Sequence, residues 1–368
     1  MTKDVLDVLY VMPSPSSTGG MRMITQMYFN AEVFKKPGYQ FFDSYYSWGE
    51  GKFIRFFQNL TQKINFAWVL LTKKIDLVYV MSSSYWGFYD KVLFCLIARL
   101  LGKKSVLNPV GGHFIFFHER NSFNRLMVPK MLRIPNGVIS GTNYWFNYFM
   151  DSFRIKQLRN IPNPVIVPTC SRGTSTNNKP LTITFLSRIE KEKGAIVFSE
   201  VVKESIESGK DYHFVIAGKG PALDQVKRNL SKYSETDQLD ILGFISEDEK
   251  KKIFEKTDIY ILPTEFEVLP VSLLEAMSYG CVVISTNVGG IPDAVEDGKT
   301  GILLEEISED AILGEVLKLD KNREIMYELG KNARERMQKT YSLPSVLKQQ
   351  RDFFLQITHS IVESNYSV

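Results

Sequence analysis

Hydrophobic and polar positions alternate along the chain between two kinds of segment. Short runs of β-branched and other apolar residues are typical of buried strands in a parallel sheet, and longer mixed segments have the length of helices. The predicted strands of the amino-terminal part are 5–12, 75–82, 104–112 and 137–143, and its predicted helices are 20–34, 53–73 and 87–101. The carboxyl-terminal part repeats the pattern, with predicted strands at 181–189, 211–220, 238–245, 257–264 and 281–290 and predicted helices over 307–368.

A segment without periodicity separates the two series. Residues 160–180 are rich in Pro, Ser, Thr and Asn, which is typical of a linker. A chain of 368 residues suits two domains. We therefore predict a βα domain over 1–165, a linker over 166–180, a second βα domain over 181–345 and a carboxyl-terminal helix over 346–368. Ligands of open α/β sheets bind beyond the carboxyl ends of the strands, so two such sheets facing each other would form one deep cleft.

Cysteine usage and the apolar runs predict a cytoplasmic protein. The three cysteines are far apart in the sequence, which argues against a disulfide framework and a Cys-rich zinc site. Asp4 and Asp7 interrupt the amino-terminal segment where a signal peptide would need an apolar core. The longest apolar run, 92–102, contains Arg99 and is too short to span a bilayer.

The charges are unevenly distributed. Residues 1–167 contain 20 Lys+Arg and 9 Asp+Glu, a balance of +11, and residues 168–368 contain 25 and 32, a balance of −7. A basic half indicates an anionic partner, such as a membrane surface, a phosphate-linked substrate or nucleic acid. Mutual attraction of the two halves is the structural alternative.

The segment 264–280 contains three glutamates around a proline. Pro270 suits the first turn of a helix, and the following spacing predicts a buried stripe formed by Pro270, Leu273, Leu274 and Met277. Glu275 falls outside this stripe, and Glu267 lies in the loop before the helix. The two carboxylates are therefore not the close pair of a retaining glycosidase. They would flank the amino end of the helix, which suits phosphate, and could accept hydrogen bonds from sugar hydroxyls.

The motifs of the second half resemble those of retaining glycosyltransferases with the GT-B fold, and more narrowly those of glycosyltransferase family four. Glu267 and Glu275 have the family's spacing. The other motifs occur in the family's order and are "FLSRIEKEKG" (185–194), "IAGKGP" (216–221), "LGFI" (242–245) and "DIYILPTEFE" (258–267). The first half matches less closely, through "PSSTGGM" (15–21) and "NPVGGHFIFFHER" (108–120). The resemblance implies an α/β protein with two Rossmann-like domains facing across a cleft and carboxyl-terminal helices that return to the first domain.

The resemblance also implies roles for individual residues. Arg188 and Lys193 would hold the diphosphate of a nucleotide sugar, although a solvated run of mixed charges is the alternative. Glu275 would bind the ribose hydroxyls, unless it is simply an exposed helical residue. Glu267 would lie against the transferred sugar, with the backbone N–H groups of Val268 and Leu269 beside the sugar or phosphate. The chain has "EVLP" where the family commonly has "EGFG", and Val268 lacks the conformational freedom of glycine. Glu265 has the wrong spacing to Glu275 and is predicted to be a surface residue.

Further donor contacts follow from the same resemblance. Gly19 and Gly20 would let the backbone approach the donor phosphate, and the base would lie against Gly218, Gly243, Phe244 and Ile245. His113 follows Gly111-Gly112 and would contact the transferred sugar, so the implied catalytic group is Glu267, His113, Arg188 and Lys193. The sequence contains no HExxH spacing and no DxD pair at a strand end, so we expect neither a metal nor another cofactor.

The implied activity is a metal-independent, retaining transfer of a hexose. The donor would be a nucleotide-diphosphate sugar, with UDP favoured over GDP-mannose, and the acceptor a saccharide on a polyprenyl diphosphate carrier, as in O-antigen, capsule or exopolysaccharide synthesis. Basic aromatic stretches at 39–58 and 114–125 predict peripheral contact with the inner face of the cytoplasmic membrane, unless these aromatics are simply buried. Arg120, Arg125 and Lys130 would supply the charge.

Three other functions compete with glycosyl transfer. One is a different GT-B enzyme, a nucleotide-sugar 2-epimerase or a phosphorylase, although no pyridoxal phosphate lysine motif is evident. Another is a catalytically silent subunit that scaffolds a polysaccharide assembly complex, which the intact charged motifs disfavour. The third is a nucleic-acid binder, which lacks a recognition module and has an acidic second half.

Overall fold

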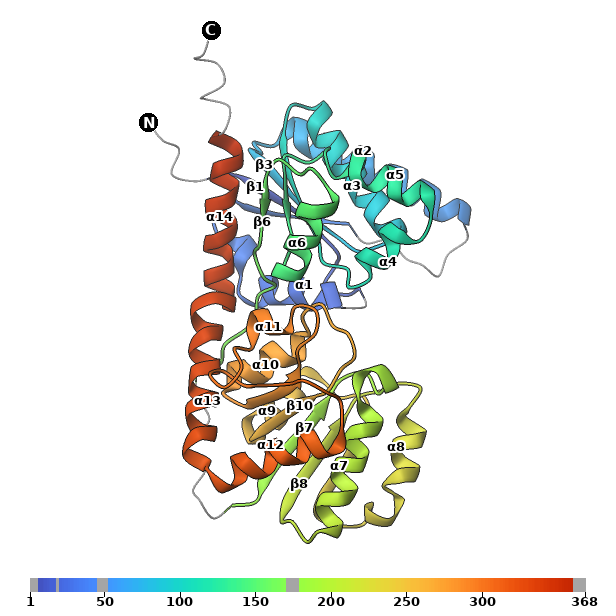
Figure 1. The fold of residues 1–368 in the computed structure, drawn as a ribbon. Coiled ribbons are helices and arrows are strands. Elements are labelled where there is room, and N and C mark those ends of the chain that lie inside the picture. Colours follow the sequence, from blue (N-terminus) through green and yellow to red (C-terminus); the bar gives the residue numbers. More distant parts are fainter. Residues whose placement is uncertain (1–5, 18–19, 45–51, 170–178, 360–368) are drawn as a thin grey trace. The chain divides into compact units, whose positions relative to one another are not determined.

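The computed structural model describes residues 6–17, 20–44, 52–169 and 179–359 (Figure 1). The chain forms two compact units. Unit 1 comprises Met1–Pro164 and Leu343–Val368, and unit 2 comprises Val165–Ser342. Unit 2 is thus inserted into the sequence of unit 1, and the chain passes between the units at Pro164–Val165 and again at Ser342–Leu343.

Unit 1 is built on a parallel sheet with strand order β2-β1-β3-β4-β5-β6. The strands are β1 (Val8–Met12), β2 (Tyr39–Asp43), β3 (Leu77–Ser82), β4 (Lys104–Pro109), β5 (Gly137–Ile139) and β6 (Leu158–Arg159). β1 and β3 are buried along their whole length. This burial explains their nearly continuous apolar sequences, because a parallel sheet is covered on both faces.

Helices cover both faces of the unit 1 sheet. They are α1 (Gly20–Asn30), α2 (Lys52–Thr72), α3 (Trp86–Leu100), α4 (Phe114–Glu119), α5 (Ser122–Met131), α6 (Asn143–Ser152) and α14 (Leu343–His359). α1 and α14 share one core cluster with the strands. On the other face Phe66 of α2 and Phe94 of α3 pack edge-to-face, with ring centroids 4.8 Å apart, and both contact Phe42 of β2.

The carboxyl-terminal helix α14 completes the core of unit 1. Phe353 and Phe354 are buried in the core cluster shared with the strands. Gln350 of α14 accepts hydrogen bonds from the hydroxyls of Tyr10 (3.3 Å) and Tyr28 (3.1 Å). The predicted return of the carboxyl-terminal helix to the first domain is therefore confirmed for α14.

Unit 2 repeats the architecture, with strand order β12-β11-β10-β7-β8-β9. Its strands are β7 (Leu181–Leu186), β8 (Tyr212–Ala217), β9 (Leu239–Leu242), β10 (Ile259–Leu262), β11 (Val282–Thr286) and β12 (Ile302–Leu304). Its helices are α7 (Ala195–Glu207), α8 (Leu223–Asn229), α9 (Glu247–Lys256), α10 (Val271–Tyr279), α11 (Ile291–Ala294), α12 (Glu309–Lys321) and α13 (Arg323–Arg336). A π-helical turn, Met337–Tyr341, follows α13.

Every predicted strand is present, but each is shorter than predicted at one end or both. Three strands were not predicted, namely β2, β6 and β12. β2 falls inside the aromatic stretch 39–58, where no strand was expected. Residues 45–51 of that stretch and 170–178 of the predicted linker lie outside the described residues.

A buried carboxylate joins α2 to α3. Asp90 of α3 lies 2.6 Å from Nζ of Lys63 and 2.7 Å from Nζ of Lys91, and it accepts a 2.8 Å hydrogen bond from Asn59. Burial acts to raise the pKa of Asp90, but Lys91 and Lys63 outweigh it and hold the pKa below its usual range. Asp90 therefore favours the folded state while it is ionised.

Replacing Asp90 by Asn is expected to destabilise the protein by about 2 kcal/mol at pH 7, because two buried ammonium groups lose their anionic partner. The lowered pKa means that Asp90 stabilises the fold above the ordinary Asp range and loses this contribution as the pH falls through the folded-state pKa. The difference between the variant and the wild type should therefore shrink below about pH 4. Urea unfolding at pH 7 and below about pH 4, followed by circular dichroism, measures the free energy of unfolding of the variant and of the wild type. Glu32→Gln, which removes the exposed pair with Lys35, is the control and should change stability by less than about 0.5 kcal/mol.

Candidate functional site

The sheet of unit 2 has one point at which the strand order reverses. The chain begins at β7, moves outward through β8 and β9, and returns to β10 on the other side of β7. The loops that follow β7 and β10 therefore leave neighbouring strands toward opposite sides. In open α/β sheets this is where ligands bind.

An ion pair joins these two loops. Nζ of Lys193 lies 2.6 Å from Oε1 of Glu267 and donates a second hydrogen bond of 2.9 Å to the carbonyl of Phe266. The two side chains are 16% and 25% exposed, so the pair is shielded but reachable. Lys193 ends the 3₁₀ turn after β7, and Glu267 follows β10. Of the sequence-predicted site residues, the structure brings these two together.

Backbone contacts fix the loop that carries Glu267. Oγ1 of Thr264 donates to the carbonyl of Glu192 at 3.1 Å, and the N–H of Glu265 donates to the same carbonyl at 2.8 Å. Oγ1 of Thr286, at the end of β11, donates to the carbonyl of Thr264 at 2.6 Å. The side chain of Glu265 is exposed, as predicted. The loops after β7, β10 and β11 therefore form one hydrogen-bonded layer.

Gly289 packs directly against the backbone of Glu267. Its φ is +56°, and a Cβ at this position would lie 1.7 Å from the carbonyl oxygen of Glu267. The neighbouring N–H of Gly290 donates to the same oxygen at 3.4 Å. Sequence reasoning gave Gly289 no role, although it lies at the end of the predicted strand 281–290. Val268 does not need a glycine-like conformation, because Glu32 and Tyr85 are the non-glycine residues with positive φ among those described.

α10 starts beside Glu267 without a side-chain cap. Pro270 is the N-cap and Val271 the first helical residue, one position later than predicted. The predicted stripe is confirmed, because Leu273, Leu274 and Met277 are fully buried. The first-turn N–H groups of such a helix carry a partial positive charge suited to an anion.

Glu275 lies outside the stripe, as predicted. It is largely buried, so the alternative of an exposed helical residue is wrong. Its side chain is 12% exposed and lies 2.7 Å from Nζ of Lys250 on α9, which also pairs with Glu247 at 2.9 Å. Burial raises the pKa of Glu275, and Lys250 partly offsets the effect. Sequence reasoning missed Lys250, which lies in the charged run "EDEKKK". The capping box of Ser246 and Glu249 starts α9, and this pattern was the sequence signal that could have placed Lys250 on a helix.

The turn after β8 is tightly packed. Gly218 has φ +141°, and a Cβ there would lie 1.9 Å from the carbonyl oxygen of Ser187. Beyond β9, Gly243 and Phe244 are exposed and Ile245 is half-buried. Nζ of Lys219 lies 5.6 Å from the ring centroid of Phe244, so the two loops face each other.

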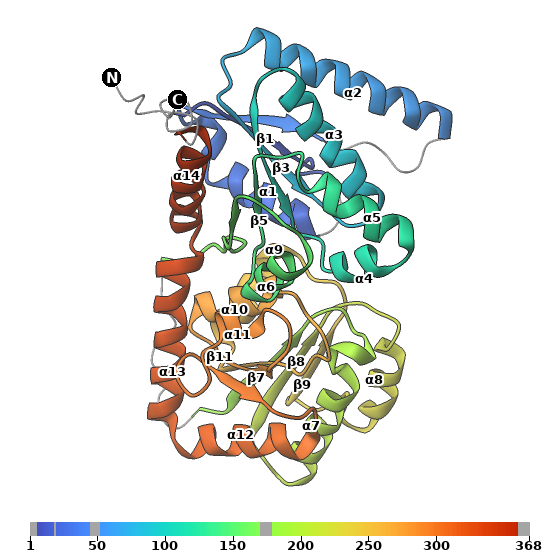
Figure 2. The ribbon, with the colours of Figure 1, turned by 45° about the horizontal axis from the view of Figure 1, so that its top comes forward.

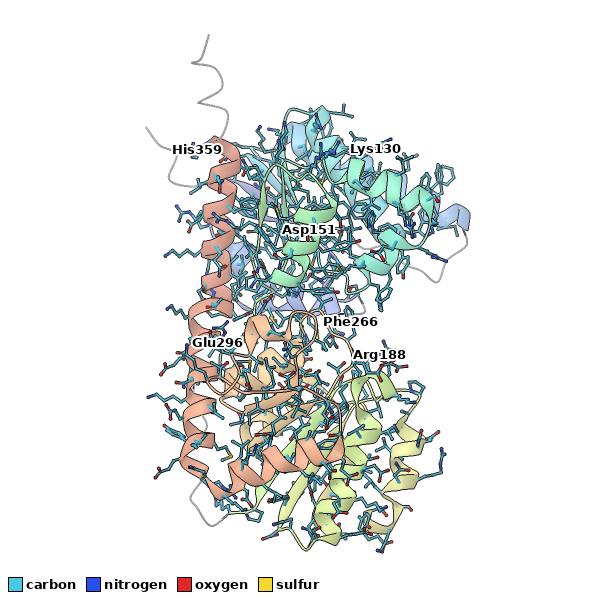
Figure 3. The ribbon with its side chains drawn as sticks, in the orientation of Figure 1. Lys130, Asp151, Arg188, Phe266, Glu296 and His359 are labelled. Atoms are coloured by element: carbon cyan, nitrogen blue, oxygen red, sulfur yellow. The ribbon has the colours of Figure 1, made fainter. Side chains whose placement is uncertain are left out.

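Arg188 follows β7 but does not join the Lys193–Glu267 pair. Its side chain is 75% exposed and pairs with Glu190. Figure 3 labels Arg188 and Phe266, which follow the adjacent strands β7 and β10 at one end of unit 2. The guanidinium is therefore available to an incoming ligand.

The remaining predicted site residues belong to unit 1. Gly20 starts α1, and Gly19 lies outside the described residues. His113 is exposed and is the N-cap of α4, with no side-chain capping bond. His118 of α4 is hydrogen-bonded through Nδ1 to the hydroxyl of Tyr148 at 2.7 Å.

Metal ligands and membrane-spanning helices are both absent from the described residues. No group of three or more His, Cys, Asp or Glu side chains in this part of the chain is placed to hold a metal ion. In the same residues, no helix combines the length and apolar character that crossing a bilayer requires.

Residues 169–336 match the protein family described as "Glycosyl transferases group 1". The putative colanic acid biosynthesis glycosyltransferase WcaL of Escherichia coli (strain K12) is 31% identical over 39% of this chain and 35% of that protein. The gpi3 subunit of the phosphatidylinositol N-acetylglucosaminyltransferase of Schizosaccharomyces pombe is 31% identical over 63% of this chain and 51% of that subunit. The chain therefore spans about half the length, or less, of these curated relatives.

The fold resembles that of a solved structure over nearly the whole chain. Anabaena Alr3699/HepE, solved in complex with UDP, superposes with a TM-score of 0.71, covering 95% of this chain and 100% of that protein at 14% identity. The α/β fold of the GT-B class, predicted from the sequence, is confirmed.

Proposed function

We propose that this chain, whose residues 169–336 match the family described as "Glycosyl transferases group 1", moves a hexose from a UDP-sugar to a saccharide acceptor during polysaccharide synthesis. The observation that carries the proposal is the Lys193–Glu267 pair at the reversal point of the unit 2 sheet. It sets a cation and a carboxylate beside the uncapped start of α10. The similarity to WcaL supports a polysaccharide product, and the similarity to the UDP complex of Alr3699/HepE supports UDP over GDP as the donor nucleotide.

The proposed chemistry is a retaining transfer that needs no metal. The bond between the anomeric carbon and the diphosphate oxygen breaks while the acceptor hydroxyl bonds to the same face of that carbon, and the hydroxyl proton passes to the departing diphosphate. Lys193, Arg188 and the first N–H groups of α10 stabilise the charge that develops on the leaving diphosphate. Glu267 accepts hydrogen bonds from the sugar hydroxyls and holds the sugar in position.

The nucleoside has a proposed place in the same unit. Glu275 accepts hydrogen bonds from the ribose hydroxyls, with Lys250 holding its carboxylate in position. The base lies against the loops of Gly218 and of 243–245. Gly19, Gly20 and His113 of unit 1 are proposed to approach the donor phosphate and the transferred sugar.

We further propose that the acceptor is carried by a polyprenyl diphosphate and that the enzyme works at the inner face of the cytoplasmic membrane. Arg120, Arg125 and Lys130 are exposed at and near α5, where Figure 3 labels Lys130. Phe123 and Leu126 of the same helix are 61% and 58% exposed. Exposed cations beside exposed apolar side chains suit the surface of an anionic bilayer.

Thermal unfolding in the presence of UDP, GDP, CMP or ADP tests the donor site. A ligand at a hundredfold of its dissociation constant stabilises the protein by about 2.7 kcal/mol. We expect UDP to stabilise the wild type selectively and Glu275→Ala to abolish the shift. Glu247→Ala is the matched control, because it removes the other carboxylate bound to Lys250 and should retain the shift.

Two results would contradict the proposal. A flat response of the folded protein to every nucleotide would favour a catalytically silent subunit. Equal loss of the shift in both variants would mean that removing either carboxylate beside Lys250 disturbs the site, and the specific role of Glu275 would be wrong.

A further inference from the structure

α2 has two apolar faces, and one of them is exposed. Phe66 and Leu70 are buried against the rest of unit 1, and the anchor of Lys63 to Asp90 lies on the same side. The exposed face consists of Ile54, Phe57, Leu60, Ile64, Trp68 and Leu71, whose exposed fractions run from 45% to 67%. Their spacing of three or four residues sets them along one stripe of the helix. Figure 2 shows α2 on the outside of unit 1, next to α3.

The charged residues within the sequence of α2 are all basic. The helix sequence contains Lys52, Arg55 and Lys63 and no Asp or Glu. Lys63 is buried in its pair with Asp90, whereas Lys73 and Lys74, which follow the last residue of the helix, are exposed. Unit 1 as a whole contains 22 Lys+Arg and 11 Asp+Glu, a balance of +11. An exposed apolar stripe that ends in exposed cations is typical of a helix that lies in the interface of an anionic bilayer.

A basic cavity lies at the edge of unit 1 where α3 ends. This helix leads back to the amino end of the strand that follows it. The cavity of about 930 Å³ at the amino end of β4, β5 and β6 is lined by five cations, Arg99, Lys104, Arg133, Arg154 and Lys156. No acidic residue lines it, and none of the five forms an ion pair within the described part of the chain. Unpaired cations around a cavity of this size suit phosphate groups.

We infer that the exposed face of α2 docks unit 1 on an anionic lipid bilayer. The apolar stripe enters the interfacial layer, and the basic cavity beside the carboxyl end of α3, together with Lys73 and Lys74 after α2, binds lipid phosphates. The inference rests on the proposed membrane association and deepens it by adding the α2 face to the α5 residues as a contact with the bilayer. The test below measures vesicle binding and needs no sugar transfer, so it can fail independently of the proposed activity.

The charges disfavour a second copy of the chain as the occupant of this face. A symmetric contact uses the same patch on both copies. If two α2 helices met in antiparallel fashion, the basic carboxyl end of one helix would meet the basic amino end of the other, with no acidic residue in either helix sequence to pair with them. A bilayer surface that contains anionic lipids offers the complementary charge.

Co-sedimentation of the full chain with lipid vesicles tests the inference. We expect binding to vesicles of phosphatidylglycerol mixed with phosphatidylcholine, and little binding to phosphatidylcholine alone. The variant Ile64→Asn/Trp68→Gln/Leu71→Gln changes exposed side chains and should lower the partition coefficient at least about tenfold. Arg99→Gln/Arg133→Gln/Arg154→Gln should lower binding to the anionic vesicles and reduce its dependence on salt. Ile325→Asn/Tyr327→Gln, which changes two residues about half exposed on α13, is the matched control and should bind like the wild type.

Three outcomes would overturn the inference. The α2 variant could bind anionic vesicles as the wild type does while remaining folded by circular dichroism. Light scattering could show a wild-type dimer that the α2 variant converts to a monomer, which would assign the face to a second copy. Binding could also be lost in Arg120→Gln/Arg125→Gln/Lys130→Gln and not in the α2 variant, which would leave α5 as the bilayer contact without α2.

Discussion

Replacing Gly289 by alanine is expected to destabilise the protein by about 2–5 kcal/mol and to displace the loop of Glu267. Two effects add. A non-glycine residue at a φ of +56° costs about 1–2 kcal/mol. The new Cβ would also lie 1.7 Å from the carbonyl oxygen of Glu267, a backbone atom that cannot rotate away, and forced repacking costs a further 1–3 kcal/mol or so, about the cost of overpacking a core. Urea unfolding measures the loss of stability.

Gly298→Ala separates the two effects. Gly298 is also in unit 2 and has a φ of +66°, but no atom lies within 4 Å of the position that its Cβ would take. It should show the conformational cost alone, about 1–2 kcal/mol. Equal destabilisation by the two substitutions would mean that the contact between Gly289 and Glu267 does not constrain the loop. A smaller UDP-induced thermal shift in Gly289→Ala than in Gly298→Ala would connect this contact to the donor site.

Lys193→Ala should weaken UDP binding by about 10–100-fold and lower the rate of sugar transfer by about 10²–10³-fold. The ammonium group is proposed to hydrogen-bond the diphosphate, and such bonds to charged groups contribute about 1.5–3 kcal/mol. Charge develops on the leaving group in the transition state, so the effect on rate should exceed the effect on affinity. Isothermal titration calorimetry with UDP gives the affinity, and release of UDP from the donor sugar gives the rate.

Lys191→Ala is the matched control for this prediction. Lys191 lies in the same 3₁₀ turn and carries the same charge, but it is exposed. Its removal should change affinity by less than about threefold, the effect of one screened surface charge. If both variants lost the same affinity, the general positive charge of the turn would explain binding, and the specific role of Lys193 would be wrong.

Local sequence patterns predicted an element well where the residues of that element alone determine it. Apolar runs marked the buried strands β1 and β3, and Pro270 marked the start of α10 to within one residue. β2 was missed because it is only partly buried, so its aromatic sequence was interpreted as a surface feature. β12 has three residues, which is too short to show a period.

Pairings between distant segments could not be predicted in the same way. The sequence pointed to Lys193 and Glu267 separately, but their contact depends on β7 and β10 being neighbours. Lys250 looks like one of several solvated lysines until α9 packs beside α10 and covers Glu275. Likewise, the α2 segment is apolar on most sides and suggests a buried helix, and only the packed structure shows which of its faces is left exposed.

The insertion of unit 2 into unit 1 has a consequence for how the chain folds during synthesis. The sequence of unit 2 is continuous, so the ribosome delivers all of it before α14 emerges. Domains tend to fold as units once their sequence is complete. The sequence of unit 1 is synthesised first, but its core is incomplete until Gln350, Phe353 and Phe354 of α14 pack with Tyr10 and Tyr28. We therefore expect the second unit to reach its native state first, while the nascent first unit keeps an apolar surface that a chaperone could protect.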